Sequence, residues 1–364
     1  MAVLFGGRSA EHDVSRVTAV AVSRALDPER YEVVPIAITT EGRWLFADEA
    51  RRAIEVGPAA LPAAFEVKGE PVEDVGALVT MGEHDAGVVR TGPLDVDVVL
   101  PLLHGPYGED GTVQGLLELA DLPYVGAGVV GSAVGMDKVM MKRAFVACDL
   151  PIARYVAFRE GHDAAALADQ VETELGYPCF VKPANMGSSV GVSKATDRSS
   201  LEAALAIALG FDEWMVVEEA VRGREIEVGV LGDDPAVASL PGEIRPGDDF
   251  YSYADKYETD AAELLAPAPL TDAQTAEVQT LAVRAFEACR CEAMARVDFF
   301  LEVDGRGFVV NELNTIPGFT PISMYPRLWE VSGVPYPELL DRLIDMAFDR
   351  HERRARRAGR QRVE

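Results

Sequence analysis

Short apolar runs bounded by glycine and polar residues alternate with amphipathic stretches along the first third of the chain. The apolar runs at residues 2–5, 31–38 and 96–103 predict three strands, and the stretch 14–26 predicts a helix after the first. Strands joined through helices favour a mostly parallel sheet, so we expect a doubly wound α/β domain. Residues 42–92 break this pattern and are interpreted as a β-rich insertion.

The remainder of the chain predicts a second and a third α/β region. A strand at residues 124–125 should lead into a helix at 132–147, and Pro151 marks a break. Further strands are predicted at residues 179–182, 190–194, 214–219, 225–231 and 236–243, and helices at 271–290 and 337–349. We therefore predict an N-terminal α/β domain (1–126), a central subdomain (127–220), a C-terminal subdomain (221–350) and a basic tail (351–364).

Two neighbouring apolar segments near residue 300 predict a β-hairpin with a polar face. A three-residue turn over 304–306 would pair Val303 with Gly307, a common hairpin length when glycine is present. The same ladder places Asp298 opposite Glu312 and Arg296 opposite Asn314. Because side chains alternate faces along a strand, these four side chains should project to one side of the hairpin. On this register Asn311 faces the other way and is not expected to be a ligand.

Directly opposed carboxylates at Asp298 and Glu312 point to a divalent cation. Their Cβ atoms would lie roughly 5 Å apart, where like charges repel unless a cation lies between them. Hard cations such as Mg²⁺ bind oxygen ligands, and the amide oxygen of Asn314 extends the set. The alternative is a surface hairpin in which Arg296 pairs with one acid. Apolar neighbours such as Phe299 and Val310 favour burial, where unpaired charge is costly.

Composition restricts the class of protein. The chain has 364 residues, 48% hydrophobic and 26% charged, as expected of an ordinary globular protein of two or three domains. Its net charge of −26 argues against nucleic-acid binding. We expect no membrane span and no export signal, and hence a cytoplasmic location with four reduced cysteines. The basic run at residues 350–357 is interpreted as a helical, solvated tail.

Two glycine-rich loops are candidates for nucleotide binding. Residues 126–131, GAGVVG, match a dinucleotide fingerprint between a strand and a helix, but no convincing ribose-binding acid follows. Lys138 in the next helix is a better phosphate ligand. Residues 187–194, GSSVGVSK, lack the spacing of a P-loop and instead suit a flap that covers phosphates with backbone N–H groups. Lys182, at the end of the preceding strand, would bind an anion or reach to solvent.

Nine motifs in colinear order resemble the ATP-grasp superfamily and, within it, the D-alanine–D-alanine ligase family. The resemblance covers residues 2–349 and implies an α+β ATP-grasp fold after the N-terminal domain. The motifs are FGGRSAEHDVS (5–15), LHGPYGEDG (103–111), GMDK (135–138), VKP (181–183), GSSVG (187–191), REIEV (224–228), YSYADKY (251–257), ARVD (295–298) and NELNTIPGF (311–319).

The resemblance implies an ATP-dependent ligation that serves peptidoglycan precursor synthesis. The carboxylate of one D-alanine attacks the γ-phosphate of ATP, and the amine of a second D-alanine then displaces phosphate from the acyl phosphate. Two Mg²⁺ (or Mn²⁺) ions would bind Asp298, Glu312 and Asn314, with Glu312 bridging. Dimers are usual in this family, so a homodimer acting on D-alanine is expected.

The resemblance also implies roles for residues around the ATP. Lys138, Lys182 and the flap with Ser189 would hold the phosphates, and Lys256 would point inward from a lid. Residues from Glu218 to Val221, Glu219 among them, would line the adenine pocket, with Glu225 on the ribose hydroxyls. Glu219 replaces a lysine that some members have near adenine.

A further set of residues would handle the two D-alanines. Arg296 and the backbone N–H of Gly318 would stabilise the oxyanion of the tetrahedral intermediate. Glu11 would bind the ammonium of the first D-alanine in a network with Ser188 and Tyr257, although on its own it could simply complement the helix dipole. The remaining substrate contacts would come from His104, Ser323 and Met324, the last where the family usually has leucine.

Three alternatives stay open. Another ATP-grasp carboxylate–amine ligase or a D-alanine–D-lactate ligase would keep the fold and change the substrate, although the Lys256–Tyr257 pair favours an amine as nucleophile. An inactive nucleotide-binding protein would keep only the fold. A dehydrogenase would use the loop at residues 126–131 to bind NAD.

Overall fold

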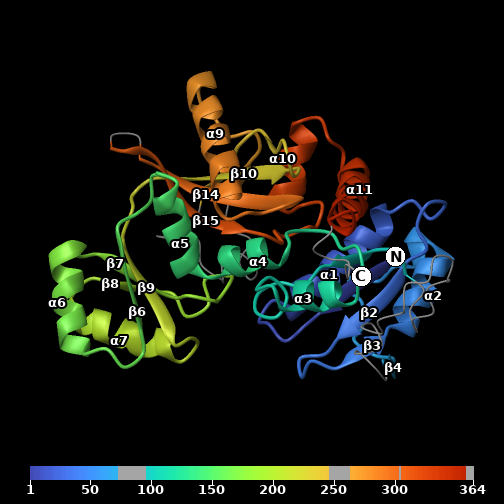
Figure 1. Ribbon diagram of the computed structural model, residues 1–364, viewed down its shortest axis with the longest axis horizontal. Helices are drawn as coiled ribbons and strands as arrows, with labels where there is room; N and C mark the ends of the chain where they lie inside the picture. Colours follow the sequence, from blue (N-terminus) through green and yellow to red (C-terminus); the bar gives the residue numbers. More distant parts are fainter. Residues whose placement is uncertain (73–95, 246–262, 303–304, 358–364) are drawn as a thin grey trace.

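The computed structural model describes residues 1–72, 96–245, 263–302 and 305–357, which form three sheets flanked by helices (Figure 1). Each sheet comes from one continuous part of the sequence. The arrangement is the mixed α/β architecture expected from the sequence. In the described residues, no helix is long and apolar enough to cross a membrane. All four cysteines are free thiols, as predicted.

The first sheet has the strand order β4-β3-β2-β1-β5. Its centre, β1 (Ala2–Gly6), β2 (Val34–Ile38) and β5 (Val99–Pro101), is parallel, as predicted, and β3 (Trp44–Phe46) and β4 (Glu70–Pro71) add antiparallel strands. Helix α1 (His12–Ala25) follows β1, and α3 (Thr112–Leu119) follows β5. The strand expected at residues 124–125 is only an isolated bridge from Tyr124 to Val99.

The prediction of a β-rich insertion at residues 42–92 was wrong where the structure describes it. Besides two short strands, it contains helix α2 (Asp48–Val56) and a 3₁₀ turn (Pro58–Ala60). The sequence of α2 is amphipathic, with only Ala50 fully buried, so its helical period was present in the sequence. Residues 73–95 lie outside the described part of the chain.

The helix expected at residues 132–147 is two helices, α4 (Val129–Met136) and α5 (Lys138–Ala147). Asp137 separates them in an extended conformation, and its carboxylate accepts hydrogen bonds from the N–H groups of Val139 and Met140, both at 2.9 Å. Such an N-cap satisfies backbone donors that the first turn leaves without partners. The new helix start places Lys138 at the N-terminal end of α5.

The second sheet is antiparallel, with the order β6-β9-β7-β8. Its strands are β6 (Tyr155–Arg159), β9 (Trp214–Glu219), β7 (Cys179–Pro183) and β8 (Ser193–Ala195). Helices α6 (Ala164–Glu174) and α7 (Arg198–Leu209) cover one face and share a core with the strands. The sequence reading named neither β6 nor these helices, and it placed β8 three residues too early.

The third sheet has the order β13-β12-β10-β14-β15, with β11 paired to β10. Its strands are β10 (Arg224–Leu231), β11 (Val237–Ala238), β12 (Gly242–Arg245), β13 (Glu263–Leu265), β14 (Met294–Glu302) and β15 (Gly307–Asn314). Helix α9 (Asp272–Ala288) packs against it, and α10 (Met324–Val331) and α11 (Tyr336–Ala355) follow. The single strand expected at 236–243 is thus two short strands.

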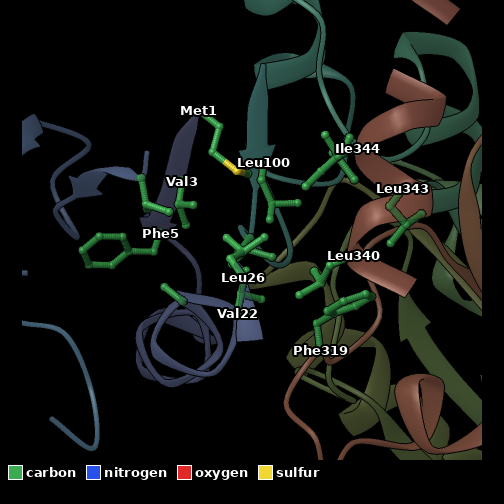
Figure 2. Close-up of a cluster of buried hydrophobic side chains, with 14 of the residues drawn as sticks. Met1, Val3, Phe5, Val22, Leu26, Leu100, Phe319, Leu340, Leu343 and Ile344 are labelled. Carbon is green, nitrogen blue, oxygen red and sulfur yellow. The ribbon is translucent and has the colours of Figure 1, made fainter. Parts of the chain in front are cut away.

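Helix α11 packs on the first sheet although it lies at the other end of the sequence. Figure 2 shows Leu340, Leu343 and Ile344 of α11 facing side chains of the first sheet and of α1, such as Leu100 and Val22. The ion pair between Arg30 and Asp341, at 2.6 Å, extends the same contact to the surface. One hydrophobic core therefore joins the two ends of the chain.

The interpretation of residues 350–357 as a solvated tail was wrong for its first part. Arg350 is 3% exposed, donates hydrogen bonds to the carbonyl groups of Tyr124 and Gly126, and stacks on the Tyr124 ring at 4.4 Å. Arg354 pairs with Glu118 and Glu292. Arg350 thus fixes the end of α11 to the loop that leads into α4, and Arg354 fixes it to α3 and to the segment before β14.

We predict that Arg350→Ala lowers the free energy of unfolding by about 2–4 kcal/mol, since it leaves two carbonyl groups without their charged donor. Chemical denaturation measures this loss. The matched control is Arg342→Ala on the same helix, whose side chain is 46% exposed and pairs with Glu338 at the surface. This substitution should lower the free energy of unfolding by less than about 1 kcal/mol. Equal losses in the two variants would contradict the structural role of Arg350.

Candidate active site

A cavity of about 700 Å³ lies between the second and third sheets. Strands β7 and β9 form one wall, strands β10, β14 and β15 form the other, and the loop at residues 186–189 borders it. The predicted site residues that line it are Lys138, Lys182, Ser188, Ser189, Glu218, Glu219, Val221, Glu225, Arg296, Asp298, Glu312 and Asn314. The structure thus brings the predicted phosphate, adenine and metal residues to one cavity. Lys256 and Tyr257 lie outside the described residues.

Five predicted site residues are not among the side chains that line this cavity: Glu11, His104, Gly318, Ser323 and Met324. The Met324 side chain is 5% exposed and packs with Ile244 and Leu328. Ser323 caps α10, and its hydroxyl lies 2.8 Å from that of Thr320. A Cβ on Gly318 would lie 3.1 Å from the Ser323 hydroxyl, so these two residues are neighbours. They stand at the start of α10, outside the cavity wall.

The predicted register of the β14–β15 hairpin is confirmed at its polar end. Arg296 pairs with Asn314, and Asp298 pairs with Glu312. Beyond Asp298 the ladder shifts by one residue, so Phe299 pairs with Val310, and Gly307 pairs with Glu302 rather than with Val303. A β-bulge of this kind inserts an extra residue into one strand and redirects its side chain. The extra residue here is Asn311.

The bulge makes the predicted orientation of Asn311 wrong. Its side chain lines the cavity, and Lys182 Nζ donates to its amide oxygen at 3.4 Å. A regular ladder would have turned Asn311 to the opposite face. The bulge therefore adds a polar side chain on the cavity side of β15, next to Glu312.

Arg296 lies between two carboxylates. Its Nε and one terminal nitrogen each donate to Asp298 at 2.7 Å, and Nε lies 3.2 Å from Glu227 Oε2. Burial works to lower the pKa of the guanidinium, but the charges of Asp298 and Glu227 outweigh it, so the pKa stays well above its usual range. Arg296 therefore remains a cation in the cavity.

Glu227 is a site residue that the sequence reading missed. It is 4% exposed, lines the cavity and faces Asp298 across the β10–β14 ladder. Alternation along β10 places it on the same face as Glu225, two residues earlier. That spacing was the signal that could have found it.

The donor set of the hairpin fits a hard divalent cation. Asp298, Glu312 and Asn314 present carboxylate and amide oxygens to one cavity, and Asn314 donates to Asp298 at 3.0 Å. Across the described ranges, no three histidine, cysteine or acidic side chains converge as a metal cluster. A cation here would thus rely on two carboxylates and an amide, together with oxygens of its ligand.

Two lysines and a glutamate occupy the end of the cavity next to α5. Lys138 Nζ donates to the carbonyl of Met186 at 2.6 Å, which ties α5 to the loop that borders the cavity. Lys182 pairs with Glu218 at 3.1 Å. Burial works to raise the pKa of Glu218, but Lys142 and Lys182 outweigh it and hold the pKa at about 2. Glu218 is therefore an anion inside a cluster of cations.

Residues 187–191 form the loop between β7 and β8 that was predicted to be a phosphate flap. Ser188 and Ser189 have φ angles of +50° and +59°, an uncommon conformation for non-glycine residues. A Cβ on Gly191 would lie 2.6 Å from the Phe211 ring, so only glycine fits there. The Ser188 hydroxyl donates to Glu11 Oε1 at 2.6 Å. This hydrogen bond joins the loop to the start of α1. It links Ser188 and Glu11, two of the three residues that were predicted to form a network, the third being Tyr257.

His104 and Glu109 hold the backbone that follows β15. His104 Nδ1 lies 3.0 Å from the carbonyl oxygen of Ile316, and Glu109 accepts from the N–H of Ile316 at 3.0 Å and of Gly105 at 2.7 Å. Because a carbonyl only accepts, Nδ1 carries the proton, and within the described residues the buried Nε2 has no hydrogen-bond partner. Only His104 of this pair was predicted as a site residue.

Glu219 bridges the second and third sheets beside the expected adenine pocket. It accepts from Arg154 Nε at 2.7 Å and from Arg306 at 2.6 Å. Arg306, in the turn of the β14–β15 hairpin, also pairs with Glu302 at 2.9 Å. The acid that replaces a lysine of some family members is thus neutralised by two arginines.

The separate N-terminal sheet and the cavity between two later sheets define the ATP-grasp class that the sequence led us to expect. The chain belongs to the D-alanine–D-alanine ligase family. The model of the N-terminal part of that family, "D-ala D-ala ligase N-terminus", matches residues 1–127, and "D-ala D-ala ligase C-terminus" matches residues 144–345.

Individual relatives agree over nearly the full length. The D-alanine–D-alanine ligase of Streptomyces griseus is 50% identical over 365 residues, covering 96% of this chain and 93% of the relative. That of Geobacillus kaustophilus is 47% identical over 359 residues, covering 96% and 95%. Among solved structures, the D-alanine-D-alanine ligase from Coxiella burnetii has a TM-score of 0.80 at 35% identity, covering 97% and 95%. The VanG D-Ala:D-Ser ligase from Enterococcus faecalis has 0.79 at 32%, covering 95% and 98%.

Glu109 should make stability depend on pH. Burial raises its pKa from 4.5 to about 7, so folding takes up a proton between these values, and stability falls as the pH rises through about 7. Between pH 4.5 and about 7, the free energy of unfolding of the wild type should fall by roughly 3 kcal/mol relative to that of Glu109→Gln. Chemical denaturation at several pH values measures the difference. The control Glu202→Gln, on the exposed face of α7, should leave the pH profile of the wild type unchanged. Parallel profiles for the wild type and Glu109→Gln would contradict this account.

Proposed function

We propose that this chain joins two D-alanine molecules in an ATP-dependent reaction through an acyl phosphate. The observation that carries the proposal is the convergence of Arg296, Asp298, Glu312 and Asn314 with Lys138 and Lys182 on one cavity. Phosphoryl transfer mainly requires positioning and neutralisation of charge, and this set provides both. Membership of the D-alanine–D-alanine ligase family supports the choice of substrate.

The nucleotide would lie between the second and third sheets. Glu218, Glu219 and Val221 stand at the end of β9, where they would line the adenine pocket, and Glu225 would hold the ribose hydroxyls. Lys138, Lys182 and the loop with Ser189 would neutralise the phosphates, assisted by Lys256. Two Mg²⁺ (or Mn²⁺) ions on Asp298, Glu312 and Asn314, when bound, would supply further neutralisation of the transferring phosphoryl group.

The reaction requires two displacements. A carboxylate oxygen of the first D-alanine attacks the γ-phosphorus and ADP leaves, and the amine of the second D-alanine then attacks the acyl carbon. Arg296 would stabilise the resulting oxyanion, with the N–H of Gly318 as a second donor. The oxyanion collapses, phosphate leaves, and the amide remains.

The first D-alanine would lie near the start of α1. Glu11 would pair with its ammonium group, in a network with Ser188 and Tyr257, and the hydrogen bond of 2.6 Å from Ser188 to Glu11 supports that arrangement. His104 would approach the substrate with Nε2, its one ring nitrogen not committed to Ile316. Ser323 and the backbone of Met324 at the start of α10 would bind the carboxylate of the second D-alanine. We expect a homodimer, as is usual in the family.

The product of ATP and D-alanine tests the proposal directly. Mass spectrometry should find D-alanyl-D-alanine, with one phosphate released per dipeptide. Because one similar structure is a D-Ala:D-Ser ligase, parallel reactions should add D-serine or D-lactate. If product forms only when D-serine or D-lactate is added, that compound would replace D-alanine as the second substrate in the proposal. No phosphate release with any of them would contradict it.

Glu312→Gln should reduce turnover more than about 100-fold, because replacing even an outer-shell partner of a metal ligand typically costs 10–100-fold. Steady-state phosphate release measures this, and an unchanged melting temperature shows that the fold persists. Glu287→Gln is the matched control, since Glu287 lies exposed on α9. Full activity of Glu312→Gln would contradict the proposed metal site.

A further inference from the structure

We propose that Lys142, which does not line the cavity, is a positioning residue for nucleotide binding. It pairs with Glu218 and balances the charge of this carboxylate, so that the charge of Lys182 remains available to the phosphates. The inference rests on the proposed function in one respect, because it takes the ligand of the cavity to be a nucleotide. Neither the sequence motifs nor the family resemblance assigned a role to this residue.

The geometry is a chain of three charged groups. Lys142 is 0% exposed, and its Nζ lies 3.1 Å from Glu218 Oε1. The other oxygen of that carboxylate, Oε2, lies 3.1 Å from Lys182 Nζ. Each oxygen of Glu218 thus lies within ion-pair distance of a different ammonium group.

The order of the three groups decides which charge a ligand meets. Lys182 and Glu218 line the cavity, whereas Lys142 is a buried residue of α5, a helix that contacts β9, and is not among the lining residues. A Lys182–Glu218 pair alone would be neutral and would attract phosphate weakly. With Lys142 the three groups carry one net positive charge, and the member open to the cavity on the phosphate side is Lys182.

A role in packing alone does not account for a lysine at this position. Burial lowers the pKa of Lys142, because the charged form loses its hydration. Lys138 precedes it by one helical turn on α5, an unfavourable spacing for like charges. A buried ion pair is often no more stable than apolar residues of the same size. Methionine would therefore fill the site adequately if only packing mattered.

Lys142→Met removes the charge and keeps the length of the side chain. Calorimetric titration with ADP and Mg²⁺, without D-alanine, should find the dissociation constant raised at least about tenfold, equivalent to 1.4 kcal/mol. Lys142→Arg should restore binding to within about threefold, because it restores the charge beside Glu218. In steady-state assays the KM for ATP should rise while the KM for D-alanine stays unchanged. A purely structural role would affect both substrates and the melting temperature together.

The control is Arg143→Met, which removes the same charge from the neighbouring, exposed position of α5 and should leave ADP affinity unchanged. A folded Lys142→Met variant with wild-type affinity for ADP would overturn the inference. If that variant does not fold, Lys142→Met combined with Glu218→Gln removes both buried charges. The double variant should match Glu218→Gln alone in ADP affinity, since Lys142 acts through Glu218, and a further tenfold loss would overturn the inference.

These outcomes are distinct from a failure of the proposed ligase activity. ADP binding is measured without D-alanine. The role of Lys142 can therefore be tested even if the protein binds nucleotide but makes no dipeptide. Wild-type protein that fails to bind ADP would overturn both proposals, whereas equal ADP binding by wild type and Lys142→Met would overturn only this one.

Discussion

The structure depends on keeping buried charges paired within a cavity that must also admit a highly charged ligand. Glu218 lies between Lys142 and Lys182, and Arg296 lies between Asp298 and Glu227. An isolated charge in these places would be costly, whereas a charge held between two of opposite sign is tolerated and oriented. Each trio also carries a net charge, one positive and one negative. The cavity thereby presents a cationic region and an anionic region a short way apart.

That separation matches the chemistry of an ATP-dependent ligase. Phosphate oxygens require cations, and metal ions require carboxylates, so a single mixed cluster would satisfy its own charges internally. The lysines lie on α5 and β7 and the acids on β10 and the β14–β15 hairpin, which limits such cancellation, although the charge of Glu312 still acts on Lys138 and Lys182. The two groups of residues come from different sheets, and the ligand would complete the pairing between them.

The hairpin could be predicted closely from the sequence because it is local. Alternation and a short turn predicted the pairing of Asp298 with Glu312, and the bulge offsets the one-residue error in the predicted pairing of Gly307. The bulge at Asn311 could not be predicted, since nothing in the local pattern marks the extra residue, and its side chain is held by Lys182 from another sheet. Lys142 was missed for a related reason, because its partner Glu218 lies on a strand that the helix alone does not reveal. Glu227, by contrast, could have been found from its two-residue spacing to Glu225 on the same strand.

Weak contrast between polar and apolar positions explains why other helices of the structure were not predicted from the sequence. Helices α6 and α7 are rich in alanine, which fits either face of a helix and blurs its period. The break between α4 and α5 depends on the capping hydrogen bonds of Asp137. The apolar pattern continues on both sides of this residue, so the sequence pattern alone did not indicate the break. The loop with Lys256 and Tyr257 lies outside the described residues, so its proposed place over the phosphates stays a prediction.

The packing of α11 on the first sheet has a consequence for how the protein is made. Tyr31 and Asp341, which share a hydrogen bond at 2.8 Å, are 310 positions apart in sequence. During synthesis the first sheet leaves the ribosome with an apolar face that α11 covers only after the second and third sheets have been made. The first sheet therefore depends for part of its core on a helix that is made after both other sheets. A chain interrupted before α11 would therefore leave this apolar surface exposed.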